Sequence, residues 1–230
     1  PARSGVGSSS SFTVGLLNCL YTLKKIRVNK KKLSERAIFV ERELCKENVG
    51  LQDQVACSYG GLNLIKFKKK QFQRKKLNLN KEIVTKLNEN LILCYSGVQR
   101  ISSDIAKKYV NKLSNRSHEE LMNANLDLVK EGINFLKKGN IDDFGKLLDK
   151  NWKMKKKLHK EISNDELDQV YNKALNSGAL GGKLLGAGAG GFFLFYVPKK
   201  KIPKFVANNK KLFITRFKFE NNGTTIINNS

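Results

Sequence analysis

The sequence predicts an α+β fold. Helical and strand-like apolar patterns alternate irregularly, without the regular strand–helix rhythm of a parallel sheet. The chain has 230 residues, 40% of them hydrophobic, which is enough for one large or two small domains with a sizeable core. Only three prolines and 9% aromatic residues argue against disorder or a linker. No apolar run reaches the roughly 18–20 residues that a membrane-spanning helix needs.

The elements of the first half follow from periodicity, caps and breakers. A strongly apolar stretch predicts a helix over residues 8–24, and a second apolar stripe predicts one over 30–46. A short helix is expected to begin near Asp53 and to end at the Gly60-Gly61 pair. Compact apolar runs predict strands over 62–67 and 91–95.

The second half is expected to be mostly helical. Periodic stretches predict helices over residues 102–113, 118–139, 141–160 and 165–176. A glycine-rich stretch, 181–191, then leads into an apolar strand over 192–197 that Pro198 ends. A helix over 203–212 and a strand over 213–219 close the fold, and the polar tail from Asn221 is expected to be loose. A domain boundary is placed between residues 98 and 120.

The chain is strongly basic, with 44 Lys and Arg against 20 Asp and Glu, a net charge of +24. The lysines occur in short scattered runs, arginines are few, and no aromatic-basic pattern of an RNA-binding sheet is present. We therefore expect a solvated basic surface that retains polyanions weakly at low salt, and no specific nucleic-acid site. A non-catalytic nucleic-acid-binding protein remains the alternative.

The four cysteines form no CxxC pair, and with only two histidines they make no zinc pattern. They are expected to be reduced thiols of a cytoplasmic protein. The residues are Cys19, Cys45, Cys57 and Cys94.

Three segments carry candidate chemistry, and the first is the run from Gly5 to Ser11 that leads directly into the apolar helix. Glycines let backbone N–H groups face a ligand, and a helix N-terminus favours phosphate. Serine hydroxyls are also possible Mg²⁺ ligands. The alternative is a flexible linker with a helix cap. The segment is not a Walker A loop, because the Gly-Lys-Ser/Thr ending is absent.

The second candidate is a pair of carboxylates. Glu41 shares a helix face with Ala37 and Cys45, so it should point towards packed structure, where a metal ion would compensate its charge. A boundary residue paired with a lysine is the alternative. Asp53 stands where a helix begins, so it either caps that helix or takes the proton of a hydroxyl that attacks a phosphoryl group.

The third candidate is the stretch from Lys183 to Gly191, in which we expect helix, glycine loop and strand to follow one another. This order is the reverse of a dinucleotide-binding turn, so a nicotinamide or flavin site is not expected. The glycines either let this stretch pack closely against a ligand-bearing loop or form a purely structural hairpin. Arg100 is a candidate for holding an anionic substrate group, with a surface arginine as the alternative.

Taken together, these segments resemble the GHMP kinases, the family of galactokinase, homoserine kinase and mevalonate kinase. The run Pro1-x-x-x-Gly5-Val6-Gly7-Ser8-Ser9-Ser10 is similar to the second motif of that family, and the run from Leu185 to Phe192 to its third. The segments 50–63 and 95–100 are most similar to the branch that phosphorylates D-glycero-D-manno-heptose 7-phosphate. The similarity extends to about residue 219.

The resemblance implies a role for each matching residue. Asp53 would be the catalytic base, Ser9 and Glu41 would hold Mg²⁺, and Arg100 would contact the substrate. The residues implied to bind ATP are Gly5, Val6, Gly7, Ser8, Ser9, Ser10, Gly186, Gly188 and Gly190. The implied reaction moves the γ-phosphoryl of ATP to the anomeric hydroxyl of heptose 7-phosphate, a step towards surface polysaccharide. Another acceptor such as galactose, fucose or mevalonate is the alternative within the family.

The implied fold has two α+β domains. Residues 1–100 would be the remainder of the ATP-binding domain, which is similar to domain 2 of ribosomal protein S5, and 101–220 a ferredoxin-like C-terminal domain, followed by a tail over 221–230. The chain begins Pro1-Ala2-Arg3 without methionine, and nothing corresponds to the family's first motif. We therefore expect a fragment of a longer protein, or an inactive remnant. Alone, it should transfer phosphate poorly, because an incomplete sheet leaves edges open and the sugar pocket half built.

Overall fold

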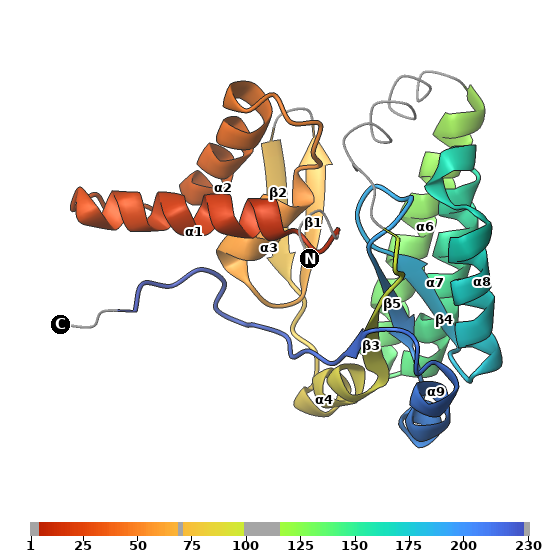
Figure 1. Ribbon diagram of the computed structural model, residues 1–230. Coiled ribbons are helices and arrows are strands. Elements are labelled where there is room, and N and C mark those ends of the chain that lie inside the picture. Colours follow the sequence, from red (N-terminus) through yellow and green to blue (C-terminus); the bar gives the residue numbers. More distant parts are fainter. Residues whose placement is uncertain (1–4, 69–70, 99–115, 228–230) are drawn as a thin grey trace. The chain divides into compact units, whose positions relative to one another are not determined.

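The computed structural model describes residues 5–68, 71–98 and 116–227 (Figure 1). The chain divides into two compact units. Unit 1 comprises Pro1–Val6 and Leu79–Phe217, and unit 2 comprises Gly7–Asn78 and Lys218–Ser230. Each unit has a hydrophobic core of its own.

In its described residues, unit 2 contains three α-helices, a π turn and a pair of antiparallel strands. In chain order these are α1 (Ser8–Leu23), α2 (Lys30–Phe39), the π turn η1 (Val40–Leu44), α3 (Gln52–Tyr59), β1 (Asn63–Lys68) and β2 (Gln71–Lys76). The Asn29 side chain caps α2 by accepting the Lys32 N–H at 2.8 Å. Val14, Leu33 and Ala37 are fully or almost fully buried and join α1 to α2. The antiparallel pair β1–β2 forms the two-stranded sheet of this unit.

Residues 220–224 are attached to the rest of unit 2 by their backbone, which corrects the expectation that the tail from Asn221 is loose. Gly61 N–H donates to Glu220 O at 2.6 Å, and Thr224 N–H donates to Cys57 O at 2.9 Å. The close approach requires glycine, because a Cβ on Gly60 would lie 2.2 Å from Gly223 N. Both Gly60 and Gly223 also have positive φ. The polar composition of this segment gave no sign of these contacts, because they are made by the backbone and not by side chains.

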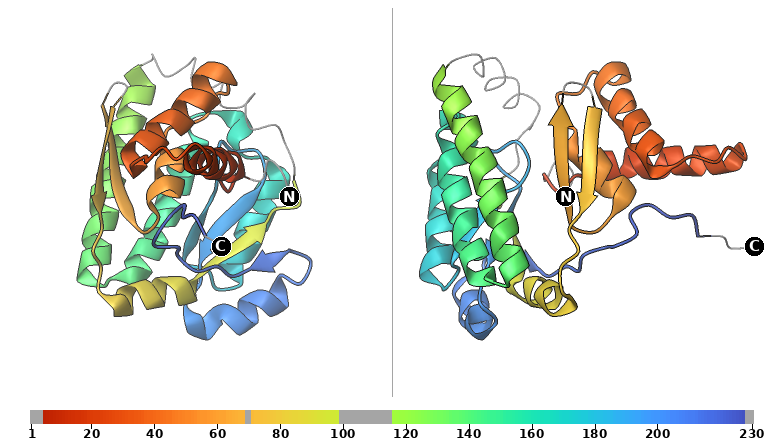
Figure 2. Two further views of the ribbon diagram at one scale, coloured as in Figure 1. Left: turned by 90° about the vertical axis from the view of Figure 1, so that its left-hand side faces the viewer. Right: turned by 180° about the vertical axis from the view of Figure 1, so that it is seen from behind.

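Unit 1 is built on a four-stranded antiparallel sheet with the order β4-β5-β3-β6. Helices α6, α7 and α8 run alongside one another on one side of this sheet (Figures 1 and 2). The helices are α4 (Lys81–Asn90), α6 (Arg116–Lys138), α7 (Ile141–Lys156), α8 (Asp165–Asn176) and α9 (Ile202–Asn208). The strands are β3 (Leu91–Tyr95), β4 (Gly181–Leu184), β5 (Phe192–Tyr196) and β6 (Ile214–Thr215), and the short 3₁₀ turns are η2 (Lys160–Ile162) and η3 (Lys199–Lys201).

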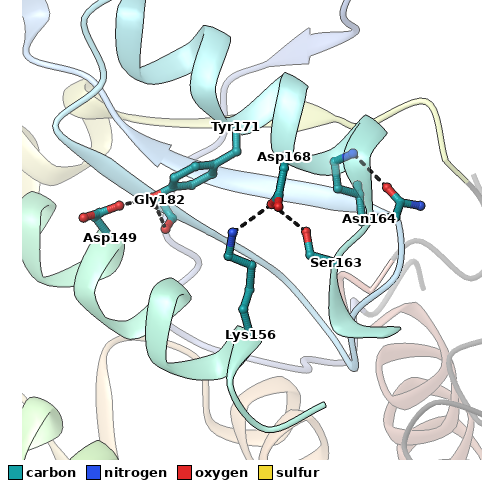
Figure 3. A network of polar contacts seen from close by, with 8 residues as sticks. Asp149, Lys156, Ser163, Asn164, Asp168, Tyr171 and Gly182 are labelled. Atoms are coloured by element: carbon teal, nitrogen blue, oxygen red, sulfur yellow. Dashed lines mark hydrogen bonds and ion pairs between the residues drawn. The ribbon is translucent and has the colours of Figure 1, made fainter. Parts of the chain in front are cut away.

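An aromatic cluster forms the centre of unit 1. The Trp152 ring meets Phe193 edge to face with centroids 5.7 Å apart, and Phe193 stacks on Phe195 at 5.3 Å. Tyr171 joins the cluster, and its Oη lies 2.8 Å from Asp149 Oδ1 and 3.1 Å from Gly182 O (Figure 3). These contacts tie α8 to α7 and to strand β4, because a buried phenol needs hydrogen-bond partners.

The helices and strands confirm most of the expected elements, with differences at a few places. The helix expected over 30–46 ends at Phe39 and continues as the π turn. Strands β2 and β4 and helix α4 were not expected. The strand expected over 213–219 shortens to Ile214–Thr215. The helix expected over 102–113 lies outside the described residues.

The compact units also differ from the expected domains. They divide at residues 78 and 79, whereas the sequence placed the boundary near residue 100. The reason is that β3 pairs with both β5 and β6, so residues 91–95 belong to the sheet of unit 1. In the ranges that the structure describes, no helix has both the length and the apolar character to cross a membrane.

Candidate active site

The carboxylate of Glu41 is the centre of a polar cluster inside unit 2. Ser9 Oγ donates to Glu41 Oε1 at 2.8 Å, and Ser10 Oγ donates to Oε2, also at 2.8 Å. Gln54 Nε2 donates to Oε2 as well. Thr13 Oγ1 lies 3.5 Å from Oε1. The start of α1, the π turn and the start of α3 thus meet at one carboxylate.

Glu41 is only 2% exposed, and no lysine or arginine of the described residues pairs with it. The alternative of a boundary residue paired with a lysine is therefore not observed. The π turn contributes to this placement, since Cys45 N–H donates to Val40 O and one extra residue widens the turn. As a result Cys45 is exposed rather than on the Glu41 face, which corrects that part of the expectation.

Asp53 lies beside this cluster, in the first turn of α3. The cap position of α3 is occupied by Leu51, and no side chain caps the helix. A Cβ on Gly7 would lie 3.3 Å from Asp53 Oδ2, so the carboxylate faces the backbone of the Gly5–Ser11 loop. Burial, and after it the negative charge of Glu41, raise the pKa of the Asp53 carboxyl. An acid with a raised pKa is better suited to accept a proton than an ordinary aspartate.

Gln54 is a functional candidate that the sequence analysis did not single out. Its side chain is completely buried, and the ionised Glu41 carboxylate can only accept, so the amide nitrogen must face it. Gln54 Oε1 is then left buried and without a partner among the described residues. A glutamine on the same buried face of a short helix as Val55 and Ser58 was the available signal, because such a position is normally apolar.

The donor set around Glu41 fits a Mg²⁺ ion. The ion prefers oxygen ligands and is usually held by one or two carboxylates together with phosphate oxygens and water. Ser9 and Glu41 offer a hydroxyl and a carboxylate, and the carboxylate is buried without a compensating cation. The described residues contain no cluster of three or more His, Cys, Asp or Glu side chains that could hold a metal ion.

The first turn of α1 provides backbone groups that could hold an anion. Gly7, with φ 75° and no capping side chain, precedes the helix, and its carbonyl accepts the Ser11 N–H at 2.9 Å. The N–H groups of the first helical residues remain without helical partners, and the helix dipole places partial positive charge there. The hydroxyl of Ser10 donates to Glu41, so its proton is not free to donate to an anion, whereas its backbone N–H lies in the first turn of the helix.

The glycine-rich stretch belongs to unit 1, where it connects β4 to β5 in an antiparallel hairpin. A strand therefore precedes the loop, which corrects the expected order of helix, loop and strand. A Cβ on Gly186 would lie 2.8 Å from the Cα of Gly5, so these two glycines pack directly on each other within unit 1. Gly188 packs on Ile162, and Gly190 packs on Val98.

The sequence candidates therefore fall into three groups. Unit 2 contains Gly7, Ser8, Ser9, Ser10, Glu41 and Asp53, and unit 1 contains Gly5, Val6, Gly186, Gly188 and Gly190. Arg100 lies outside the described residues. Two further residues that the sequence analysis did not single out, Lys155 and Lys183, lie beside the glycine-rich loop.

Two parts of the chain match domains of one known family. Residues 1–61 match the N-terminal domain of the GHMP kinases, and residues 133–213 match the C-terminal domain of the same kinases. The chain belongs to the GHMP kinase family. GHMP kinases are phosphotransferases that use ATP as the phosphate donor, and the two-domain α+β fold is the fold of this family.

Similar proteins include several GHMP kinases with different acceptors. The D-glycero-alpha-D-manno-heptose 7-phosphate kinase of Campylobacter jejuni is 31% identical over 97% of this chain and 67% of its own length. A galactokinase of Clostridium tetani is 27% identical over 91% of this chain and 62% of its own length. Among solved structures, a protein of Campylobacter jejuni is 26% identical over 97% of this chain and 63% of its own, with a TM-score of 0.70. The chain thus spans about two thirds of the length of these relatives.

Proposed function

We propose that this GHMP kinase chain transfers the γ-phosphoryl group of ATP to the anomeric hydroxyl of D-glycero-D-manno-heptose 7-phosphate. The observation that carries the kinase chemistry is the buried Glu41 carboxylate held by Ser9 and Ser10 at the start of α1, with Asp53 beside it. The 31% identity to a kinase named for that heptose phosphate supports the acceptor. The free thiols support a cytoplasmic location, as expected from the sequence.

Each set of candidate residues has its own task in this reaction. The backbone of Gly5, Gly7 and the first turn of α1 holds the phosphates of ATP. Gly186, Gly188 and Gly190 shape the glycine-rich loop between β4 and β5. Ser9 and Glu41 would hold Mg²⁺. The ion, when bound, neutralises charge on the phosphate oxygens.

Asp53 acts on the acceptor. As the anomeric oxygen attacks the γ-phosphorus, its proton passes to the Asp53 carboxylate and the bond from the γ-phosphorus to the bridging oxygen breaks. The products are ADP and the heptose 1,7-bisphosphate. The raised pKa of Asp53 favours this proton transfer.

The nucleotide site is tested by calorimetric titration of the purified chain with ATP, with Mg²⁺ and with EDTA. We expect binding that depends on Mg²⁺ and is weakened about tenfold or more by Glu41→Gln and by Ser9→Ala. The matched control is Glu43→Gln, which changes an exposed glutamate on the same π turn. The proposal is overturned if ATP does not bind at millimolar concentration, or if Glu41→Gln behaves like Glu43→Gln.

The acceptor is tested by transfer from radiolabelled ATP, with incubations long enough to detect slow turnover. The panel contains heptose 7-phosphate, galactose, fucose and mevalonate. We expect label in the heptose at its anomeric position, which phosphorus NMR identifies. The galactokinase relative favours galactose as the second candidate, and preferential labelling of galactose would replace the heptose assignment.

A further inference from the structure

The lysines of α7 differ in their partners. Four of the five pair with carboxylates, one of which is drawn in Figure 3. The pairs are Lys146–Asp143 at 2.8 Å, Lys150–Glu131 at 3.5 Å, Lys153–Asp149 at 2.8 Å and Lys156–Asp168 at 2.9 Å. Lys155 has no carboxylate partner among the described residues. Its charge is therefore compensated differently from that of its neighbours.

Lys155 turns towards the loop between β4 and β5. Its Nζ donates to Leu184 O at 3.1 Å and to Gly186 O at 2.6 Å. These two carbonyls flank the point where the glycine-rich loop begins. An ammonium group has three N–H donors, so one donor of Lys155 remains for another acceptor. When protonated, the side chain thus places a positive charge at the entrance of the loop.

Lys183, on β4, adds a second positive charge at the same place. It also has no ion-pair partner among the described residues. Burial lowers the pKa of Lys183, and burial together with the charge of Lys183 lowers the pKa of Lys155 to about 7. Two neighbouring cations repel each other, and an anion bound beside them would offset that repulsion.

The backbone of the loop is suited to the same anion. In the part of the chain that the structure describes, the N–H groups of Gly186, Ala187 and Gly188 donate to no other protein group. Gly186 and Gly188 have φ of 67° and 122°, so residues with positive φ stand on either side of Ala187 in this loop. Successive N–H groups of this kind form concave anion sites.

We propose that Lys155 and Lys183, with the backbone of residues 186–188, bind a phosphate group of a substrate. The proposal rests on the proposed function for its two candidate ligands, because that reaction brings together the phosphates of ATP and the 7-phosphate of the sugar. A purely structural role, in which Lys155 braces the hairpin, accounts for its two carbonyl contacts. That structural role does not explain why Lys183 lies near Lys155 with no carboxylate partner among the described residues.

The first test measures ligand binding to the full 230-residue chain by calorimetry. The variants are Lys155→Met and Lys183→Met, and the matched control is Lys156→Met, the next lysine on α7, which pairs with Asp168. The ligands are ATP, ADP, heptose 7-phosphate and tripolyphosphate. We expect the first two variants to weaken a phosphate ligand about tenfold or more, and the control to change its affinity less than twofold.

The pattern of losses identifies the phosphate. Weaker binding of ATP, ADP and tripolyphosphate with unchanged binding of the sugar phosphate assigns the site to the nucleotide. The converse pattern assigns it to the acceptor. Equal weakening by all three variants would reveal only a general effect of net charge and would overturn the proposal, as would unchanged binding of every ligand. If ATP and heptose 7-phosphate both bind normally in these variants, the proposed kinase function stands and only this site fails.

The second test uses the unmodified chain, so it does not depend on the folding of the variants. Lysines are acetylated at pH 7 with and without each ligand, and the modified positions are identified by mass spectrometry. A lysine with a lowered pKa is partly neutral at this pH and reacts readily. We expect the bound phosphate to protect Lys155 and Lys183 and to leave Lys156 unchanged. Equal labelling of Lys155 and Lys183 with and without a saturating ligand would contradict the proposal.

Discussion

At the residue scale, Glu41 shows how a buried charge is kept in one orientation. Its Oε2 accepts from Ser10 and Gln54, whereas its Oε1 accepts from Ser9 and lies 3.5 Å from the hydroxyl of Thr13. Ser9 and Glu41 would hold an ion, and the contacts of Ser10 and Gln54 with Oε2 would keep the carboxylate in place. We therefore regard Gln54 as a residue that positions the carboxylate, since its amide nitrogen donates to Oε2 while Ser9 donates to Oε1.

Replacing Gln54 tests this positioning. Gln54→Leu should weaken Mn²⁺ binding, measured by electron paramagnetic resonance as a probe of the Mg²⁺ site, by about tenfold, because a hydrogen bond to a charged group contributes roughly 1.5–3 kcal/mol. ATP binding in EDTA should stay unchanged. Gln52→Leu is the matched control, since Gln52 is exposed on the same helix. Equal metal affinity in the two variants would contradict the role.

Replacing Asp53 should have opposite effects on the stability of the fold and on the rate of phosphoryl transfer. Burial and Glu41 raise its pKa in the folded chain, so the folded state binds the Asp53 proton more tightly than the unfolded state. The ionised form therefore destabilises the fold above the folded pKa, and this cost disappears below the unfolded pKa of about 3.9. Asp53→Asn should raise Tm at pH 7, and the gain should shrink as the pH falls towards about 4.

The same variant should transfer phosphate roughly 10²–10⁴-fold more slowly, because it lacks the base. Melting curves between pH 7 and pH 4 check the first effect, and transfer from labelled ATP checks the second. Transfer within a factor of a few of the unmodified chain would show that Asp53 is not the base. A lower Tm at pH 7 would show that its carboxylate stabilises the fold.

At the element scale, α1 has a glycine at its N-terminal cap, where the backbone needs one, and another inside the helix, where the backbone does not. Gly7 has φ 75°, and a Cβ there would approach Asp53 Oδ2 to 3.3 Å. Gly15 lies inside the helix, and a Cβ there would meet nothing within 4 Å. The first glycine is required by the loop, and the second weakens the helix without a visible structural benefit.

This contrast gives a matched pair of substitutions. Gly15→Ala should stabilise the chain by about 1 kcal/mol, a rise in Tm of about 2–4 °C, because alanine has the higher helix propensity. Gly7→Ala should lower Tm and weaken ATP binding, because it strains the loop and presses on Asp53. Calorimetric melting and ATP titration of both variants check the pair. The interpretation fails if Gly7→Ala is as stable as Gly15→Ala and binds ATP normally.

At the scale of the whole molecule, the net charge of +24 predicts weak binding of polyanions. Heparin or DNA should bind at low salt and dissociate steeply as salt rises, because such binding depends on the release of counterions. ATP binding with Mg²⁺ should persist at 0.3 M salt, since it uses directed contacts. Titrations of both ligands across salt concentrations check this prediction. Sequence-selective, salt-resistant DNA binding without ATP binding would instead support the nucleic-acid alternative.

The sequence allowed much of the fold and part of the candidate site to be predicted, for identifiable reasons. Helix α8 and strand β3 were predicted with their observed bounds, because each has a regular apolar pattern and a clear stop signal. Strand β2 was missed because Gln71–Lys76 is almost entirely polar and only Phe72 is buried. Strand β4 was missed because two of its four residues are glycines, which carry no side-chain pattern.

The sequence by itself determined the family, because three motifs of that family occur in it in the expected order. They are the glycine–serine loop, the Gly50–Asn63 segment and the glycine-rich stretch. Only the tertiary structure brought Ser9, Glu41 and Gln54 onto one carboxylate, because those residues are separated by up to 45 positions. It alone distinguished Lys155 from the other lysines of α7. Lysines look alike in a sequence, and only folding decides which ammonium group meets a carboxylate and which is left to face a loop.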